Sequence, residues 1–195
     1  MSTGLVEDSQ AHTEDDLISV EDGSDFVRRS TRDAARAHLE RNDVKKLLNK
    51  IITNDEDTVV LKIKNHLLAD INNVVLNAII DALYKNKVCQ ALYAQNLVKA
   101  MGDNELEALI ELCKRKKIWC LNVGENYNVS TVAWTKFSRS LLDTNITHLY
   151  VSEHTIKLSL KNEMRANIRS NRKKHSLHSS MKNIRVIERC TNMWW

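Results

Sequence analysis

The sequence predicts an α/β fold, a short right-handed solenoid of about four strand-helix units with a helical cap at each end. A strand signature recurs around central leucines, which are Leu61, Leu92, Leu121 and Leu149. The steps from each of these leucines to the next are 31, 29 and 28 residues. Amphipathic segments with helical spacing lie between the strands. Units of this length bury their apolar faces only by stacking, so the period predicts an array.

The composition fits one folded domain with charged ends. The chain has 195 residues, of which 43% are hydrophobic, and it has no proline and four glycines, which argues against a collagen-like or low-complexity chain. The net charge of +4 hides an asymmetry. Residues 1–26 hold eight acids and no lysine or arginine, whereas residues 157–195 hold ten lysines and arginines and two acids. Each end therefore has the capacity to attract a charged partner.

The chain divides into four expected parts. Residues 1–26 are too polar to offset the entropy of ordering, so we expect disorder there. The next segment carries apolar residues at helical spacing and is expected to break near Asn42 and Asp43. The parts are an acidic tail at 1–26, an N-terminal helical cap at 27–54, the repeats at 55–156 and a basic helical cap at 157–195.

Three polar residues are placed to begin the helices that follow the strands. Asp70, Asp103 and Ser130 are of the types that accept a hydrogen bond from the first turn of a helix. We expect the apolar residues of each helix to face the strands, which for the helix after Ser130 include Val132 and Phe137.

The cysteines indicate a reducing location. Cys89, Cys113, Cys120 and Cys190 include no pair with Cys-x-x-Cys spacing, and no signal peptide precedes them. No stretch approaches the roughly 18 apolar residues of a membrane span. The sequence therefore predicts an intracellular protein, cytoplasmic or nuclear, with free thiols, among which Cys113 and Cys120 are buried.

The third unit carries an asparagine that points to a known class of repeat. Asn126 follows Leu121 and Val123 in this unit. With this pattern, residues 55–156 resemble the leucine-rich repeat superfamily, specifically the long-repeat subtype of ribonuclease inhibitor, the Ran GTPase-activating proteins and tropomodulin. The resemblance implies that Asn126 bonds neighbouring strand turns to one another. The other units depart from the pattern and have His66, Leu97 and His154 in the equivalent position.

The end of the chain carries a second likeness. Residues 171–175 and 190–195 are similar to the ends of repeat proteins from algae and other protists, and this likeness implies no firm activity. The superfamily resemblance implies a repeat fold that serves as a binding surface, and it assigns no catalytic residue.

In such arrays the strands line a concave face, here called the strand face, which is turned away from the helices. The central leucines point to the helices, so their neighbours point outward. Two tyrosines among amides and charges favour protein recognition, because tyrosine is enriched in interfaces. The alternative is that these residues are merely the solvated side of a half-buried sheet. We predict a non-enzymatic scaffold or targeting subunit that binds another protein through Lys62, Lys64, Tyr93, Gln95, Asn122, Tyr150 and Ser152.

The basic end supports an alternative function. A helix over residues 158–174 would bring much of its positive charge to one face and pack Leu160, Met164 and Ile168 on the fourth repeat. Such clusters neutralise phosphates, so the alternative is a nucleic-acid or phosphate-binding protein modulated by the acidic tail. The simpler interpretation is that this helix only caps the array and that its charges face water. The residues of this alternative are Lys161, Arg165, Arg169, Arg172, Lys173 and Lys174.

The sequence has no pattern typical of an enzyme or a cofactor site. Four scattered glycines cannot form a phosphate-binding loop, and no catalytic Ser/His/Asp or Cys/His grouping stands out. His175, His178 and Cys190 lack the second cysteine that a zinc site of this kind needs. We therefore expect no catalytic residue, metal, cofactor or small-molecule substrate.

Overall fold

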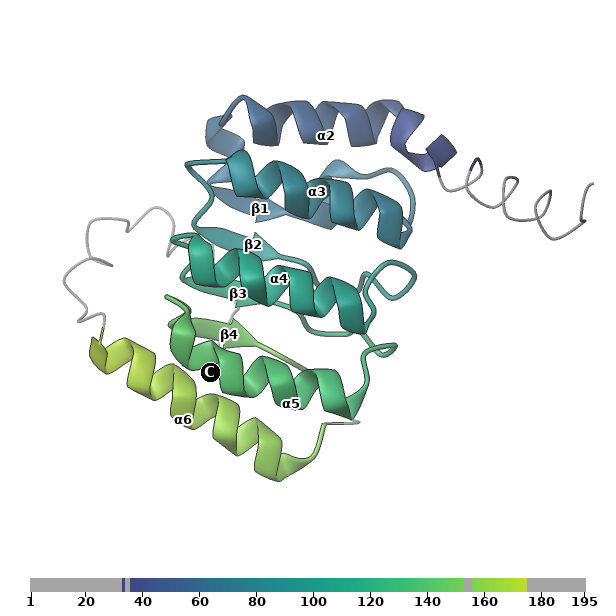
Figure 1. Ribbon diagram of the computed structural model, residues 1–195. Coiled ribbons are helices and arrows are strands. Elements are labelled where there is room, and N and C mark those ends of the chain that lie inside the picture. The colour runs from purple at the N-terminus through teal and green to yellow at the C-terminus, as the bar shows by residue number, and fades with distance from the viewer. Residues whose placement is uncertain (1–32, 34–35, 153–155, 175–195) are drawn as a thin grey trace, which may run out of the picture.

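The fold is a stack of four strand-helix units (Figure 1). The computed structural model describes residues 33, 36–152 and 156–174, so the predictions for residues 1–26 lie outside it. The strands are β1 (Val60–Lys62), β2 (Ala91–Tyr93), β3 (Cys120–Asn122) and β4 (His148–Tyr150). The helices are α2 (Asn42–Ile52), α3 (Asn73–Lys85), α4 (Asp103–Arg115), α5 (Thr131–Ser140) and α6 (Leu158–Lys174). Short 3₁₀ helices are η1 (His38–Glu40), η2 (Glu56–Thr58), η3 (Ile63–His66) and η4 (Leu141–Asp143).

The strands form one parallel sheet in the order β1-β2-β3-β4, and the helices lie in a layer on one side of it (Figure 1). The central leucines stand in register, so that Leu61 pairs with Leu92, Leu92 with Leu121 and Leu121 with Leu149. Parallel neighbours require a crossover, and each crossover here is a helix, with the right-handed sense that such connections take. The structure therefore confirms the predicted right-handed α/β solenoid of four strand-helix units and the alignment of its central leucines.

One hydrophobic core runs through the stack between the sheet and the helices. All four central leucines are 0% exposed. The same cluster extends from Val44 in α2 to Ile168 in α6. Full burial of one leucine side chain contributes about 1.5–3 kcal/mol, so stability depends on keeping neighbouring units stacked.

The predicted N-cap of the helix after β3 is confirmed, whereas the predicted N-cap of the helix after β1 was wrong. Ser130 caps α5, since its hydroxyl accepts a hydrogen bond from the N–H of Ala133 at 3.2 Å. Asn72 rather than Asp70 caps α3, because its Oδ1 accepts the N–H of Val75 at 3.1 Å. The loop before α3 is therefore two residues longer than expected.

Asp103 links two units instead of capping its own helix. It is the first residue of α4, and its carboxylate accepts hydrogen bonds from the hydroxyl and the backbone N–H of Ser130 at 2.6 and 2.7 Å. These bonds lower the pKa of Asp103. Val132 is 67% exposed, so its predicted inward direction was wrong. It lies roughly 200° around α5 from the buried Trp134, because each helical residue advances about 100°.

The turn after β3 is built on Asn126, as predicted. This side chain is 0% exposed and donates from Nδ2 to the carbonyls of Ala94 and Val123, both at 2.9 Å. Its Oδ1 accepts the N–H of Leu97 at 2.8 Å. The second unit keeps the turn geometry without this asparagine, since Asn96 has a φ of 52°. Asn126 thus supplies bonds to two units.

The end helices cover the stack. The chain breaks between η1 and α2 near Asn42, as predicted, and α2 packs on α3. The helix predicted over residues 158–174 is α6, which buries Leu160, Met164 and Ile168 and packs on α5. It occupies the place of the fourth unit's helix, and the residues after Lys174 lie outside the described part.

Candidate binding surface

The strand face carries two side chains from each strand, one before and one after the central leucine. These positions align across the sheet, so they form two rows. The first row is Val60, Ala91, Cys120 and His148, and the second is Lys62, Tyr93, Asn122 and Tyr150.

Tyr93 does not project from this face. It is only 8% exposed and packs with Val60, Ala91 and Cys120. The ammonium of Lys62 lies 4.9 Å from the centroid of its ring, a distance at which a cation is attracted to the ring face. Neighbouring strands are about 4.8 Å apart, so long side chains lean over one another instead of pointing straight out. The expected exposed anchor is therefore part of an apolar patch beneath Lys62.

Tyr150 lies against the backbone of the turn that follows β3. A Cβ atom added to Gly124 would meet Cε1 of Tyr150 at 2.7 Å and Oγ of Ser152 at 2.9 Å. The glycine therefore makes room for the tyrosine ring. Tyr150 remains partly exposed, and the buried hydroxyl of Ser152 has no hydrogen-bond partner among the described residues.

Asn122 acts within the protein. It is 4% exposed, accepts the N–H of Gly124 at 3.0 Å, and donates from Nδ2 to Oε1 of Gln95. Gln95 is exposed. Of the predicted site residues on this surface, Lys62, Gln95 and Tyr150 offer accessible atoms, and Tyr93 and Asn122 mainly support them. Lys64 is exposed too, but it lies in η3, beyond the strand.

A second cluster on the strand face was missed in the sequence. The rings of Trp119 and His148 meet edge to face with centroids 5.2 Å apart. Trp119 also donates from Nε1 to Oε1 of Gln90 at 3.3 Å, and the hydroxyl of Thr147 lies 3.0 Å from Nδ1 of His148. The spacing in the sequence could have indicated this cluster. Gln90, Trp119 and Thr147 each precede a central leucine by two residues, so they come from equivalent positions of neighbouring units.

The basic residues of α6 divide between contacts to the protein and exposure. Arg172 donates from Nε to the carbonyl of Thr147 at 2.7 Å, and Lys174 donates to the carbonyl of Leu142 at 3.1 Å. Burial, followed by the charge of Arg169, lowers the pKa of Arg172. Other predicted anion-site residues are Lys161 and Arg165, both half-buried, and Arg169 and Lys173, both exposed. Arg165 also donates to Oδ1 of Asn162 at 2.9 Å.

The thiols are placed for packing. Cys89, Cys113 and Cys120 are buried thiols that form no disulfide with one another, and Cys190 lies outside the described residues. Burial raises the pKa of Cys89 to about 12 and also raises the pKa of Cys113. In the described part of the chain no three His, Cys, Asp or Glu side chains gather as a metal site would need. Among the same residues, no helix has both the length and the apolar character to cross a bilayer.

Comparisons with known proteins give the fold and no family. No family model matches the sequence, and no curated protein matches it. A tropomodulin C-terminal domain from Caenorhabditis elegans is similar at a TM-score of 0.47 and 14% identity, over 71% of this chain and 98% of that chain. Leiomodin-1 Actin-Binding Site 2 is similar at a TM-score of 0.51 and 13% identity, over 72% of this chain and 96% of that one.

The likeness to the ribonuclease-inhibitor-type long-repeat subtype was wrong. Leiomodin-1 Actin-Binding Site 2, which is similar to this chain in fold, gives no evidence for a ribonuclease-inhibitor-type repeat. A step of 28–31 residues reflects the length of one strand, one helix and two loops. Different classes of strand-helix array share that length, so it does not identify a subtype. The likeness to algal and protist chain ends rested mostly on residues outside the described part.

Proposed function

We propose that this chain is a non-enzymatic protein-binding module, a scaffold or targeting subunit that receives its partner on the strand face. The observation that carries the proposal is the patch around Tyr93 and Tyr150, which has Lys62 and Gln95 at its border. Aromatic side chains held on a rigid sheet and bordered by polar groups are typical of protein interfaces.

The solved structures suggest a first partner to test. The leiomodin domain, which has this fold, is by its name an actin-binding site. Actin is therefore the first purified protein to offer to the chain. Nucleic-acid or phosphate binding by α6 has less support, because Arg172 and Lys174 are engaged with backbone carbonyls.

Site-specific cross-linking tests which face binds. The full chain would carry benzoylphenylalanine at exposed Gln95 on the strand face or, as the control, at exposed Glu107 on α4. Each would be irradiated with actin and with nuclease-treated extract of the source cells. We expect a cross-linked protein from the Gln95 position and none from Glu107. Products only from Glu107, or from neither position, would contradict the proposal.

A tyrosine substitution tests the patch. Tyr150→Ala should weaken binding of the cross-linked partner by about 2 kcal/mol, or roughly 30-fold in Kd, because interface tyrosines often dominate affinity. Tyr127→Ala is the matched control, since Tyr127 is 54% exposed and lies outside the strand face. Tyr93→Ala is a poorer test, because the loss of a buried ring would also lower stability. Equal Kd values for Tyr150→Ala and the unmodified chain would place binding elsewhere.

A further inference from the structure

A pocket of about 320 Å³ lies between the loops that leave β1 and β2. Its lining is mixed, with the apolar residues Leu67, Leu68, Ile71 and Val98, the basic residues Lys64 and Lys99 and the acidic residue Asp70. This volume is at the lower end of the range for ligand sites. A ligand with apolar side chains and carboxylates would match it.

The first wall of the pocket is fastened to the N-terminal cap. Arg41 donates from Nη1 to the carbonyl of Asp70 at 2.8 Å and from Nη2 to that of Ala69 at 3.1 Å. Asp43 accepts the N–H of Leu68 at 2.7 Å, and its hydrogen bonds to Arg41 help lower its pKa to about 2. Leu68 is nevertheless 92% exposed. A fixed loop holds this apolar side chain in water. A ligand that covers the side chain therefore lowers the free energy of the system.

The second wall is fastened to the third unit. The N–H of Leu97 donates to Oδ1 of Asn126 at 2.8 Å, and the carbonyl of Val98 accepts Nδ2 of Asn128 at 2.7 Å. Lys99 reaches back to the first wall, with its Nζ 3.3 Å from a carboxylate oxygen of Asp70. Because both walls are held before any ligand arrives, binding requires little ordering of the pocket.

Residues 17–27 of the same chain have the matching chemistry. Their sequence is Leu-Ile-Ser-Val-Glu-Asp-Gly-Ser-Asp-Phe-Val, with five apolar side chains, three acids and no lysine or arginine. The apolar residues suit the leucines of the pocket, and the acids suit Lys64 and Lys99, whose charges exceed that of Asp70.

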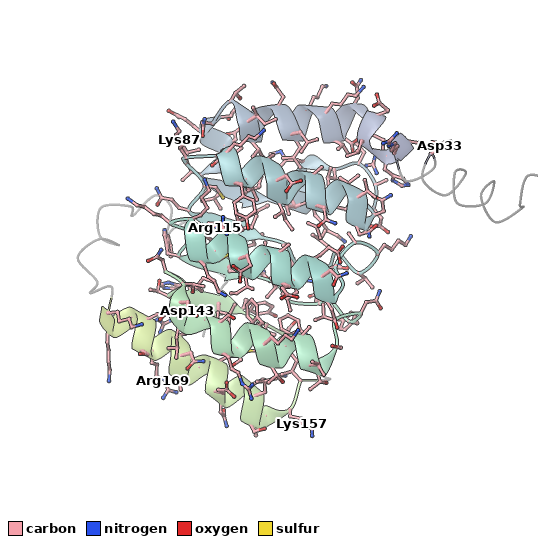
Figure 2. All side chains as sticks on the ribbon, in the orientation of Figure 1. Asp33, Lys87, Arg115, Asp143, Lys157 and Arg169 are labelled. Carbon is pink, nitrogen blue, oxygen red and sulfur yellow. The ribbon has the colours of Figure 1, made fainter. Side chains whose placement is uncertain are left out.

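The chain enters the stack next to this pocket. Asp33 and Lys157, which precedes α6, lie on the side of the molecule with the strand-to-helix loops, whereas Lys87 and Arg115 lie on the opposite side (Figure 2). The bonds from Arg41 to the 69–70 carbonyls place the start of α2 against the pocket wall.

A short stretch of chain joins this segment to the described part. The six residues from position 27 to position 33, the first described residue, span about 20 Å when extended. Tethering gives an effective concentration on the order of millimolar. The basic helix α6 is a more distant site for these acids, because Arg169 lies at the other end of the stack (Figure 2).

We propose that residues 17–27 dock in the pocket between the β1 and β2 loops of the same chain. Leu17, Ile18, Val20 or Phe26 cover Leu68, and the acids face Lys64 and Lys99. The proposal does not depend on protein binding by the strand face. Docking covers Lys64, which belongs to the predicted binding set, so the segment competes with any partner that uses this lysine.

Intramolecular photo-cross-linking in the full chain tests the docking. With Phe26→benzoylphenylalanine, digestion and mass spectrometry should find cross-links to residues 64–71 and 96–99, with a yield unchanged on tenfold dilution of the protein. Leu68→Asp should lower that yield at least fivefold. Since Leu68 is exposed, the fold is expected to persist, and circular dichroism checks this. Val132→Asp, an equivalent change on exposed α5 surface, is the matched control and should leave the yield unchanged.

Other outcomes would overturn the proposal. Absence of cross-links, cross-links concentrated in residues 158–174, or equal loss of yield in Leu68→Asp and Val132→Asp would each show that the pocket is not the docking site. A yield that falls on dilution would show that the segment binds a second copy. The probe at Phe26 is separate from the probe at Gln95, so failure of this proposal is distinguishable from failure of the strand-face proposal.

Discussion

Asn126 shows how one buried side chain joins two units. Replacing it with alanine leaves the N–H of Leu97 and the carbonyls of Ala94 and Val123 without their side-chain partner. Each buried polar group that loses its partner costs about 1–3 kcal/mol. We predict that Asn126→Ala lowers the free energy of unfolding by about 3 kcal/mol or more, as measured by urea denaturation.

A neighbouring asparagine provides the control. Asn128 is exposed and donates one hydrogen bond, to Val98. Asn128→Ala should therefore cost less than about 1 kcal/mol. If the two variants unfold at the same urea concentration, the buried network at Asn126 is not a source of stability.

At the scale of elements, the burial of His148 in β4 and the nearby charge of Arg172 in α6 make stability depend on pH. Burial, and then the charge of Arg172, lowers the pKa of His148 below its ordinary value of 6.5. The folded state therefore disfavours protonated His148. Above pH 6.5 His148 is neutral in both states, and the fold keeps its full stability. As the pH falls from 6.5 toward the lower folded pKa, the unfolded state binds the proton more readily and stability is lost.

The predicted effect is a rise in the pKa of His148 in Arg172→Met, followed by NMR titration. The pH dependence of unfolding below about pH 6.5 should become shallower in the same variant, because folded and unfolded pKa values approach each other. Burial also lowers the pKa of His66, so part of the acid destabilisation will remain. Arg169→Met is the control, since Arg169 is exposed. An unchanged His148 pKa in Arg172→Met would show that burial alone sets it.

At the scale of the whole molecule, the stacked leucines make the four units interdependent. Leu92→Ala or Leu121→Ala should cost about 2–5 kcal/mol through lost burial and a cavity. In so short an array each unit relies on its neighbours, so we predict a single earlier transition in circular dichroism and in tryptophan fluorescence.

The exposed Leu68 provides the contrast for these melts. Leu68→Ala should change the free energy of unfolding by less than about 0.5 kcal/mol, because its side chain is 92% exposed. Wild-type melting temperatures for both Leu92→Ala and Leu121→Ala would refute the role of the leucine seam.

The role of Asn126 came from the resemblance to a repeat superfamily. The sequence alone determined the solenoid, the alignment of its central leucines and the extent of α6. These features follow from spacing along the chain, because strands alternate with period two, helices turn every 3.6 residues and units repeat at 28–31 residues. Local periodicity also placed the Ser130 cap. It failed at Asp70, where long-range bonds from Arg41 hold the loop and Asn72 starts the helix.

Tertiary packing decided which surface residues are accessible and where the pocket lies. Tyr93 is covered because Lys62, 31 residues earlier on the neighbouring strand, lies over its ring. Tyr150 packs against Gly124 in the turn that follows β3. The Trp119–His148 pair and the loop fastened by Arg41 and Asp43 likewise join residues from different units. Such contacts depend on rotamers and on distances of a few ångströms between units, and residue spacing along one chain specifies neither.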